Sequence, residues 1–299
     1  MTLRKTARPR PAGAGRQANR PRKRFGQHFL LQAWARKVVV AVAAQPGDVF
    51  LEIGPGKGAL TLPLAESGAS ILAVEIDRDL VAALAPQVPR NVTVMTGDVL
   101  TTDVLAVLSG LEPTRPPQSP STASGPTRRF RVVGNLPYNI TSPILTRLIE
   151  WHRREALFDD AILMMQREVA DRVVAKPGTK AYGVLTVMLA VHAKITRLLD
   201  LPPGAFKPAP KVRSSVVRLE FGPPAVRIVD EPLFERMVKM MFAQRRKTLA
   251  NALKSFDATA PAVLALARID GRRRPETLQL EEIARLAELF ASVRRPPVL

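Results

Sequence analysis

The run Asn135-Leu136-Pro137-Tyr138 has the groups needed to act on an exocyclic adenine amine. The lone pair of such an amine is delocalised into the ring, so the amine is a poor nucleophile. Methyl transfer to it needs acceptors that hold the amine protons and let the nitrogen become pyramidal. The Asn135 side-chain carbonyl and the main-chain carbonyl of Leu136 or Pro137 can supply these acceptors, and Tyr138 offers a ring on which a flipped base stacks.

A second set of residues has the spacing of a nucleoside site. The loop Gly54-Pro55-Gly56-Lys57-Gly58 lets a ligand approach the backbone closely, although taken alone it is equally consistent with a tight turn. Glu75, 21 residues after Gly54, can accept hydrogen bonds from both hydroxyls of a ribose. Asp98 is placed to accept from an adenine amine. Each acid alone is more consistent with a surface cap, but the three features together are far more specific.

The glycine spacing separates two candidate cofactors. A nicotinamide dinucleotide would also need a ribose-binding acid, but this loop lacks the Gly-x-Gly-x-x-Gly spacing that seats a pyrophosphate on a helix N-terminus. We expect Glu52, just before the loop, to repel a pyrophosphate and to tolerate a cationic cofactor. S-adenosylmethionine has a sulfonium, an ammonium group and no phosphate, so the electrostatics favour it.

Alternating strands and helices are predicted to position these residues. A helix is expected at 34–44. Buried strands are expected after it at 49–53, 70–75, 91–96, 130–134 and 160–165, with helices between them, the first of which reaches about residue 67. Such alternation indicates right-handed parallel crossovers in a doubly wound α/β sheet. The segments 193–201 and 214–221 are expected to close its edge as an antiparallel pair. The predicted fold is therefore a seven-stranded Rossmann-like sheet.

Composition changes divide the chain into three parts. Residues 1–21 are predicted to be a disordered basic arm, and 22–225 the cofactor-binding domain. The Pro-, Ser- and Thr-rich stretch 112–127 is expected to be a mobile insertion in that domain. After the break at Gly222-Pro223-Pro224, residues 226–299 are predicted to form a small helical domain.

The net charge of +19 is concentrated at the two ends of the chain. Residues 1–24 have nine basic and no acidic residues, 25–199 have 18 against 15, and 200–299 have 18 against 11. A polyanion such as RNA is the partner that this distribution attracts, although a solvated basic surface is the simpler alternative.

Other residue types exclude several classes of protein. The chain has no cysteine, which removes disulfides, thiolate catalysis and cysteine-ligated zinc. Its three histidines are not at metal-ligand spacing, so we expect no metal. No apolar run reaches about 18 residues, so we expect no membrane partner.

Seven motifs, in this order and over about residues 22–290, resemble the ribosomal RNA adenine dimethyltransferase family, and within it the small-subunit enzymes. These motifs are Arg24-Phe25-Gly26-Gln27-His28-Phe29-Leu30, Glu52-Ile53-Gly54-Pro55-Gly56, Glu75-Ile76-Asp77, Gly97-Asp98, Asn135-Leu136-Pro137-Tyr138, Phe206-Lys207-Pro208-Ala209-Pro210-Lys211-Val212 and Phe242-Ala243-Gln244-Arg245-Arg246-Lys247-Thr248-Leu249.

The resemblance implies roles for individual residues. Phe206 matches an aromatic that forms a second stacking wall opposite Tyr138, beside the catalytic run. The positions that match the S-adenosylmethionine site are His28, Leu30, Gly54, Glu75, Asp98 and Asn135. The family often has Asn at the position of His28. The residues expected to bind RNA are Arg22, Lys23, Arg24, Arg245, Arg246 and Lys247.

The resemblance also implies an activity and a partner. The expected reaction is dimethylation of two adjacent adenines near the 3′ end of 16S rRNA in an immature 30S subunit, by a cytoplasmic monomer with a role in ribosome biogenesis. One alternative is the macrolide-resistance type, which dimethylates one adenine in large-subunit rRNA and more often has Ile at the position of Leu136. Another is a non-enzymatic assembly factor, against which the intact Glu75, Asp98, Asn135 and Tyr138 argue.

Overall fold

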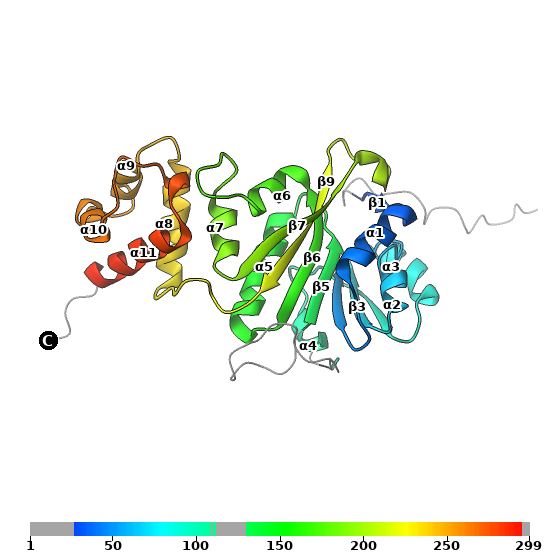
Figure 1. Cartoon of the computed structure of the whole chain (residues 1–299). Coiled ribbons are helices and arrows are strands. Elements are labelled where there is room, and N and C mark those ends of the chain that lie inside the picture. Colours follow the sequence, from blue (N-terminus) through cyan, green and yellow to red (C-terminus); the bar gives the residue numbers. More distant parts are fainter. Residues whose placement is uncertain (1–26, 109, 112–129, 295–299) are drawn as a thin grey trace, which may run out of the picture.

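The computed structural model describes residues 27–108, 110–111 and 130–294. Its centre is a seven-stranded sheet of order β4-β3-β2-β5-β6-β9-β7, with helices on both faces (Figure 1). A separate short antiparallel pair joins β1 to β8. The predicted arm at 1–21, the residues Arg22, Lys23 and Arg24, and the insertion at 112–127 lie outside the described residues.

The strands span Phe29–Leu30 (β1), Val49–Ile53 (β2), Ser70–Glu75 (β3), Val92–Thr96 (β4), Phe130–Asn135 (β5), Phe158–Gln166 (β6), Ala193–Leu201 (β7), Phe206–Lys207 (β8) and Ser214–Phe221 (β9). The α-helices span Gln32–Val42 (α1), Thr61–Ala65 (α2), Arg78–Leu84 (α3), Val104–Leu108 (α4), Thr141–Glu155 (α5), Arg167–Val173 (α6), Val184–Ala190 (α7), Glu231–Ala243 (α8), Leu249–Lys254 (α9), Ala260–Ala267 (α10) and Leu280–Arg294 (α11).

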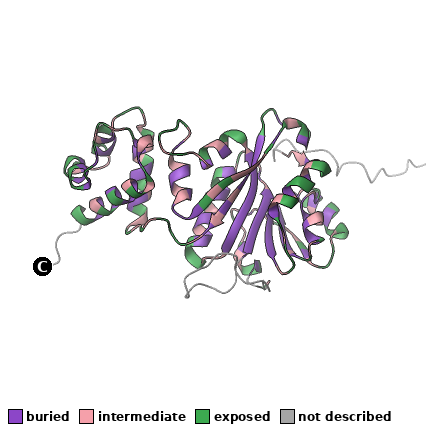
Figure 2. Ribbon diagram, in the orientation of Figure 1, coloured by how far each residue is buried: buried purple, intermediate pink, exposed green. Residues whose placement is uncertain are grey.

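Five strands, β4, β3, β2, β5 and β6, run parallel, as the alternation predicted. Helices cover both faces, so the central strands β2, β5 and β6 are buried along nearly their whole length (Figure 2). Parallel strands end at one edge of the sheet. The loops after β2, β3, β4 and β5 therefore meet there.

The predicted antiparallel pair at the edge of the sheet is confirmed. Strand β9 pairs antiparallel with both β6 and β7 and lies between them. Met164 on β6 lies opposite Val216 on β9, and both side chains are buried in the core. This pair covers what would otherwise be an open edge at β6.

Two helix ends differ from the sequence prediction for a backbone reason. The first helix covers Gln32–Val42 and not 34–44, because Ala43 adopts a left-handed conformation with φ 51°. Its N–H then caps the Val39 and Val40 carbonyls at 3.2 Å. The helix after the glycine loop ends at Ala65, short of 67, where the chain turns into Gly68 at φ 81°.

The C-terminal part is helical, as predicted, with α8 to α11 packed around a core of their own. That core also contains Tyr182, Val187 and Val191, which lie in or beside α7. The helical part thus packs on residues that precede 226, while the boundary between two independent domains at 225 stays a prediction.

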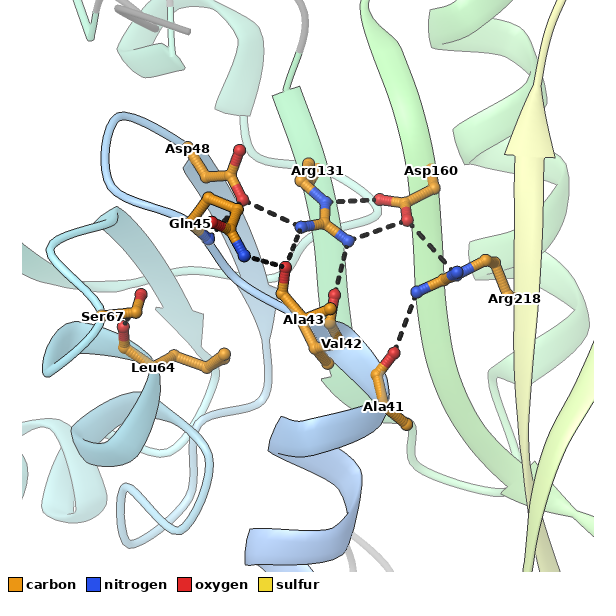
Figure 3. A network of polar contacts seen from close by, with 10 residues as sticks. All are labelled: Ala41, Val42, Ala43, Gln45, Asp48, Leu64, Ser67, Arg131, Asp160 and Arg218. Carbon is orange, nitrogen blue, oxygen red and sulfur yellow. Dashed lines mark hydrogen bonds and ion pairs between the residues drawn. The ribbon is translucent and has the colours of Figure 1, made fainter. Parts of the chain in front are cut away.

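A buried ionic network fixes α1 at the amino edge of the sheet (Figure 3). Arg131 on β5, 3% exposed, donates to Asp48 at 2.8 Å and to Asp160 at 2.8 and 2.9 Å. Its Nη2 also donates to the Val42 carbonyl at 2.8 Å, at the end of α1. Arg218 on β9 contacts Asp160 at 3.5 Å and donates to the Ala41 carbonyl. Helix α1 directly follows β1, so by fixing α1 the network also helps to fix β1, which lies at the carboxyl edge of the sheet.

Candidate active site

A cavity of about 190 Å³ lies at the carboxyl edge of the sheet. It is surrounded by residues at or after the ends of β2, β3, β4 and β5, by residues 27–29 at the start of β1, and by Leu80 on α3. They are Gln27, His28, Phe29, Gly54, Gly56, Glu75, Ile76, Leu80, Asp98, Leu100, Asn135, Leu136, Pro137, Tyr138, Asn139 and Ile140. The cavity thus brings together His28, Gly54, Glu75, Asp98 and the whole run 135–138, as expected from the sequence.

The glycine loop needs its glycines for conformation and for space. Gly54 and Gly56 have φ of 71° and 58°, which side-chain-bearing residues rarely adopt. A Cβ at Gly56 would lie 3.3 Å from the Phe29 ring. The loop therefore presents bare backbone to the cavity.

Glu75 ties the glycine loop to the end of β3. Its Oε2 accepts from the Gly56 N–H at 3.1 Å and its Oε1 from the Asp77 N–H at 3.0 Å. Burial raises the pKa of the Glu75 carboxyl, while these two hydrogen bonds act against the rise. Each carboxylate oxygen has further lone pairs, so the group can also accept from two ligand hydroxyls.

Asp98 follows β4 and also lines the cavity. Its Oδ1 accepts from the Leu100 N–H at 2.9 Å, which fixes the carboxylate at the start of the turn. Its Oδ2 accepts no hydrogen bond from the described residues that surround it. The side chain is thus oriented while one oxygen is left for a ligand.

The role expected for Glu52 is wrong. The register of β2 turns its side chain into the interior, where it is 1% exposed and does not line the cavity. Burial raises the pKa of its carboxyl to about 7; the charge of Glu75 acts in the same direction and the Thr61 hydroxyl against it. The negative potential of the cavity therefore comes from Glu75 and Asp98.

Asn135, at the end of β5, has its side-chain amide oriented by the backbone. Its Nδ2 donates to the His28 carbonyl at 2.8 Å. Since the amide nitrogen is committed to that contact, Oδ1 is left as an acceptor at the cavity wall. The role of Asn135 as the first of the two acceptors stays a prediction.

The sequence left two candidates for the second acceptor, the main-chain carbonyls of Leu136 and Pro137. Their existing hydrogen bonds distinguish between them. The Pro137 carbonyl already accepts from the Ile140 N–H at 3.2 Å and from the Thr141 hydroxyl at 3.1 Å. The Leu136 N–H donates to the Met164 carbonyl at 3.0 Å, which anchors the run to β6. The Leu136 carbonyl is therefore the better candidate for the second acceptor.

Tyr138 is half-buried and fixed at both its hydroxyl and its ring. The hydroxyl shares a hydrogen bond of 2.7 Å with Ser214 Oγ at the start of β9. The ring stacks on His28, with ring centroids 5.5 Å apart and an interplanar angle of 26°. Burial raises the pKa of the Tyr138 phenol, so it stays neutral at physiological pH.

Leu30 and Phe206 lie apart from the cavity. They pair in the β1–β8 sheet, and both side chains are buried in one core cluster, Phe206 with 3% of its surface exposed. Neither lines the cavity. The ring that faces Tyr138 in this structure is His28, so the stacking wall expected from Phe206 is not formed here.

The basic residues expected to bind RNA fall into two groups. Arg245, in the loop between α8 and α9, donates to the Thr179 carbonyl at 3.2 Å and lies 3.9 Å from a Glu276 carboxylate oxygen. Arg246 and Lys247 in the same loop are exposed. The loop therefore presents two accessible cations, while Arg245 joins two segments of the protein.

Several cavity residues were missed by sequence reasoning. Ile76 directly follows Glu75, and Leu100 comes two residues after Asp98. Both give the cavity an apolar lining. Asn139 and Ile140 continue the run that begins at Asn135. The signal available was adjacency to residues already singled out. Ser214 had no such signal, since only strand pairing brings it to Tyr138.

The cavity fits S-adenosylmethionine. It has a bare glycine backbone and two carboxylates, and of the described residues that line it none is Lys or Arg, so nothing there offers charge to a phosphate. Together with the sheet topology, this site defines an S-adenosylmethionine-dependent methyltransferase. A family model described as ribosomal RNA adenine dimethylase matches residues 18–292. The chain belongs to the ribosomal RNA adenine dimethylase family.

Relatives and solved structures agree with this family. Two proteins named ribosomal RNA small subunit methyltransferase A are similar to this chain. The one from Magnetococcus marinus is 42% identical, over 89% of this chain and 91% of that protein. The one from Syntrophotalea carbinolica is 43% identical, over 91% of this chain and 97% of that protein. The crystal structure of a dimethyladenosine transferase from Plasmodium falciparum has the same fold, with TM-score 0.67 and 22% identity over 89% of this chain and 98% of that one. The crystal structure of the 23S rRNA methyltransferase ErmE has a TM-score of 0.62 and 26% sequence identity, and the match covers 88% of this chain and 99% of that one.

Within residues 27–108, 110–111 and 130–294, no helix is long and apolar enough to cross a membrane. The same ranges contain no group of three or more acidic or histidine side chains that could hold a metal ion.

Proposed function

We propose that this protein dimethylates the exocyclic amines of two adjacent adenines near the 3′ end of 16S rRNA, with S-adenosylmethionine as donor. The observation that carries the proposal is the orientation of Asn135. Its Nδ2 donates to the His28 carbonyl, which leaves Oδ1 as an acceptor, and Asn135 and Leu136 both line the cavity. The Asn135 Oδ1 and the Leu136 carbonyl would be two acceptors for the two protons of an adenine amine.

Separate parts of the cavity would hold the donor. Glu75 and Asp98 would accept from its ribose hydroxyls and its adenine amine, and the backbone at Gly54 would cradle its methionine end, with the segment at His28 beside it. When bound, S-adenosylmethionine supplies an electrophilic methyl group and leaves as S-adenosylhomocysteine. The protein adds orientation, which can contribute about 7–11 kcal/mol to lowering the barrier.

The run 135–138 would act on the target base. Hydrogen bonds from the amine to Asn135 Oδ1 and to the Leu136 carbonyl draw its protons out of the ring plane, so that the nitrogen lone pair becomes available. Tyr138, fixed through Ser214, offers a ring to the flipped base. Base stacking on such a ring contributes about 1–3 kcal/mol.

The relatives support the small-subunit substrate over the large-subunit one. Proteins named small subunit methyltransferase A are 42–43% identical over most of the chain, against 26% for the 23S rRNA enzyme. A substrate of this kind would be an immature 30S subunit in the cytoplasm. We propose that the activity takes place there, in a monomer that contributes to ribosome biogenesis.

The RNA would be held outside the cavity by basic residues. Arg246 and Lys247 are exposed and can neutralise phosphates. The same role is proposed for Arg22, Lys23 and Arg24 and for the basic arm before them. Arg245 would act through its contacts to Thr179 and Glu276, by holding this loop in place.

Primer extension on both ribosomal RNAs tests the proposal. Subunits that lack the methyl groups are incubated with the protein and S-adenosylmethionine, and reverse transcription stops at dimethylated adenines. A stop at a pair of adjacent adenines near the 3′ end of 16S rRNA is expected, most of it at the 3′ adenine, which reverse transcription reaches first. A single stop in 23S rRNA would favour the large-subunit alternative, and no stop in either RNA would favour a non-enzymatic role.

A further inference from the structure

His28 has contacts that a residue of the cofactor site does not require. Its ring stacks on Tyr138, with centroids 5.5 Å apart and planes 26° from parallel. Its Nδ1 lies 2.8 Å from the Pro208 carbonyl, and because a carbonyl only accepts, Nδ1 carries the proton of this hydrogen bond. The ring is thus held against the residue on which the target base is expected to stack.

The spacing leaves no place for a base between these two rings. Stacked aromatic rings have centroids at least about 4.5 Å apart, so a base between two rings requires their centroids to be about 9 Å apart. The centroids of His28 and Tyr138 are 5.5 Å apart. An adenine can use this face of Tyr138 only after the imidazole has moved away.

The surrounding contacts make this movement a change of the side chain alone. The His28 backbone is fixed independently, because its carbonyl accepts from Asn135 Nδ2 at 2.8 Å and the next two residues form β1, with Phe29 opposite Lys207. One hydrogen bond to Pro208 and one stacking contact hold the ring, which is only half-buried. Rotation of the ring therefore leaves the Asn135 acceptor in place.

We propose that the His28 imidazole occupies the target-adenine position on Tyr138 in the RNA-free protein, and that the adenine displaces it on binding. His28 then affects the affinity for the RNA substrate, because the adenine must break the stacking contact between His28 and Tyr138 before it can stack on Tyr138 itself. This inference rests on the proposed function, which supplies the adenine. It assigns the imidazole to the base side of the cavity, whereas the His28 backbone serves the cofactor side.

The proposal predicts opposite effects for two substitutions. His28→Asn removes the ring and keeps a donor for Pro208, so the Tyr138 face is open. The half-saturating concentration of unmethylated 30S subunits in single-turnover methyl transfer is expected to fall by about 2- to 10-fold, the factor to which one aromatic pair corresponds. His28→Phe keeps a ring on Tyr138, and its half-saturating concentration is expected to be no lower than that of the unaltered protein.

A double-mutant cycle with Tyr138→Ala shows whether the effect passes through Tyr138. In that background His28→Asn is expected to give no gain in apparent affinity. Calorimetric titration with S-adenosylmethionine and a thermal melt of each variant separate changes in cofactor binding or folding from changes in RNA binding.

An unchanged or higher half-saturating concentration for His28→Asn, or an equal gain in the Tyr138→Ala background, overturns the proposal. These results are distinguishable from failure of the proposed function. In that case the unaltered protein itself transfers no methyl group to 16S rRNA.

Discussion

Glu75 combines two tasks in one carboxylate. It accepts from the Gly56 and Asp77 backbones, and in the proposed complex it also accepts from the ribose. Glu75→Gln replaces one carboxylate oxygen by an NH₂ group. This donor then faces a backbone N–H, which is also a donor. We expect the affinity for S-adenosylmethionine to fall by about 10- to 100-fold, the factor for a hydrogen bond to a charged group.

Isothermal titration with S-adenosylmethionine measures this loss. Glu66→Gln, at an exposed position after α2, is the matched control and should bind as the unaltered protein does. Equal affinities for the two variants would remove Glu75 from the cofactor site.

Glu52 makes stability depend on pH. Its pKa is about 7 in the folded protein, above the ordinary value of 4.5, so the folded state binds more protons than the unfolded state between those values. Stability contributed by this group is full below about pH 4.5 and is lost as pH rises through 7. The difference corresponds to about 3 kcal/mol.

Glu52→Gln removes this dependence. The free energy of unfolding is measured in urea at pH 5 and at pH 8. The difference between the variant and the unaltered protein should be more in favour of the variant at pH 8 than at pH 5. Glu66→Gln should show no such gain, and a constant difference between the Glu52 variant and the unaltered protein at both pH values would contradict the buried state of this carboxyl.

Some of the residues expected at the site line the cavity and others do not, for one physical reason. Glu75, Asp98 and Asn135 each end or follow a parallel strand, and such ends meet at one edge, so local pattern was enough. The position of Phe206 depends on pairing with Leu30, 176 residues earlier in the chain, which no local pattern reveals. The direction of Glu52 depends in the same way on how β2 lies in the sheet.

At the scale of secondary structure elements, the Arg131 network joins β5, β6, the residue before β2 and the end of α1. Arg131→Met leaves Asp48 and Asp160 buried without this partner. A broken buried ion pair costs about 3–5 kcal/mol. We expect a loss of that size in the free energy of unfolding, measured in urea.

Arg172→Met is the control for this substitution. Arg172 pairs with Glu168 along α6, and both side chains are mostly exposed. Exposed pairs contribute about 0–1 kcal/mol. A loss in Arg131→Met no larger than that of Arg172→Met would show that the network does not hold α1 on the sheet.

The elements themselves were predicted well where patterns are regular. The strands β2 and β3 have the predicted ends, and the antiparallel edge pair was foreseen. Helix ends were less accurate because Ala43 stops α1 in a left-handed conformation that alanine rarely adopts. The contact of α7 with the C-terminal helices was not foreseen, since it depends on tertiary packing.

At the scale of the whole molecule, charge and site are separated. The cavity is lined by two acids and no Lys or Arg among its described residues, whereas Arg246 and Lys247 lie exposed between α8 and α9. The double variant Arg246→Ala, Lys247→Ala should weaken binding to 30S subunits and reduce the salt dependence by about one unit of slope per lost contact.

Binding at several salt concentrations measures this slope. Affinity for S-adenosylmethionine should not change. Lys194→Ala, a highly exposed position on the edge strand β7, is the control and should leave the slope unchanged. The same slope for the double variant and the unaltered protein would remove this loop from the RNA-binding surface.

The central claim is that Asn135 holds the amine of an rRNA adenine, and nucleoside mass spectrometry of 16S rRNA tests it most directly. Unmethylated 30S subunits are treated with S-adenosylmethionine and either the unaltered protein or Asn135→Ala. We predict two dimethyladenosines per subunit with the first, and with the second a rate lower by about 100-fold or more at nearly unchanged cofactor affinity. Equal dimethylation by Asn135→Ala would contradict the account.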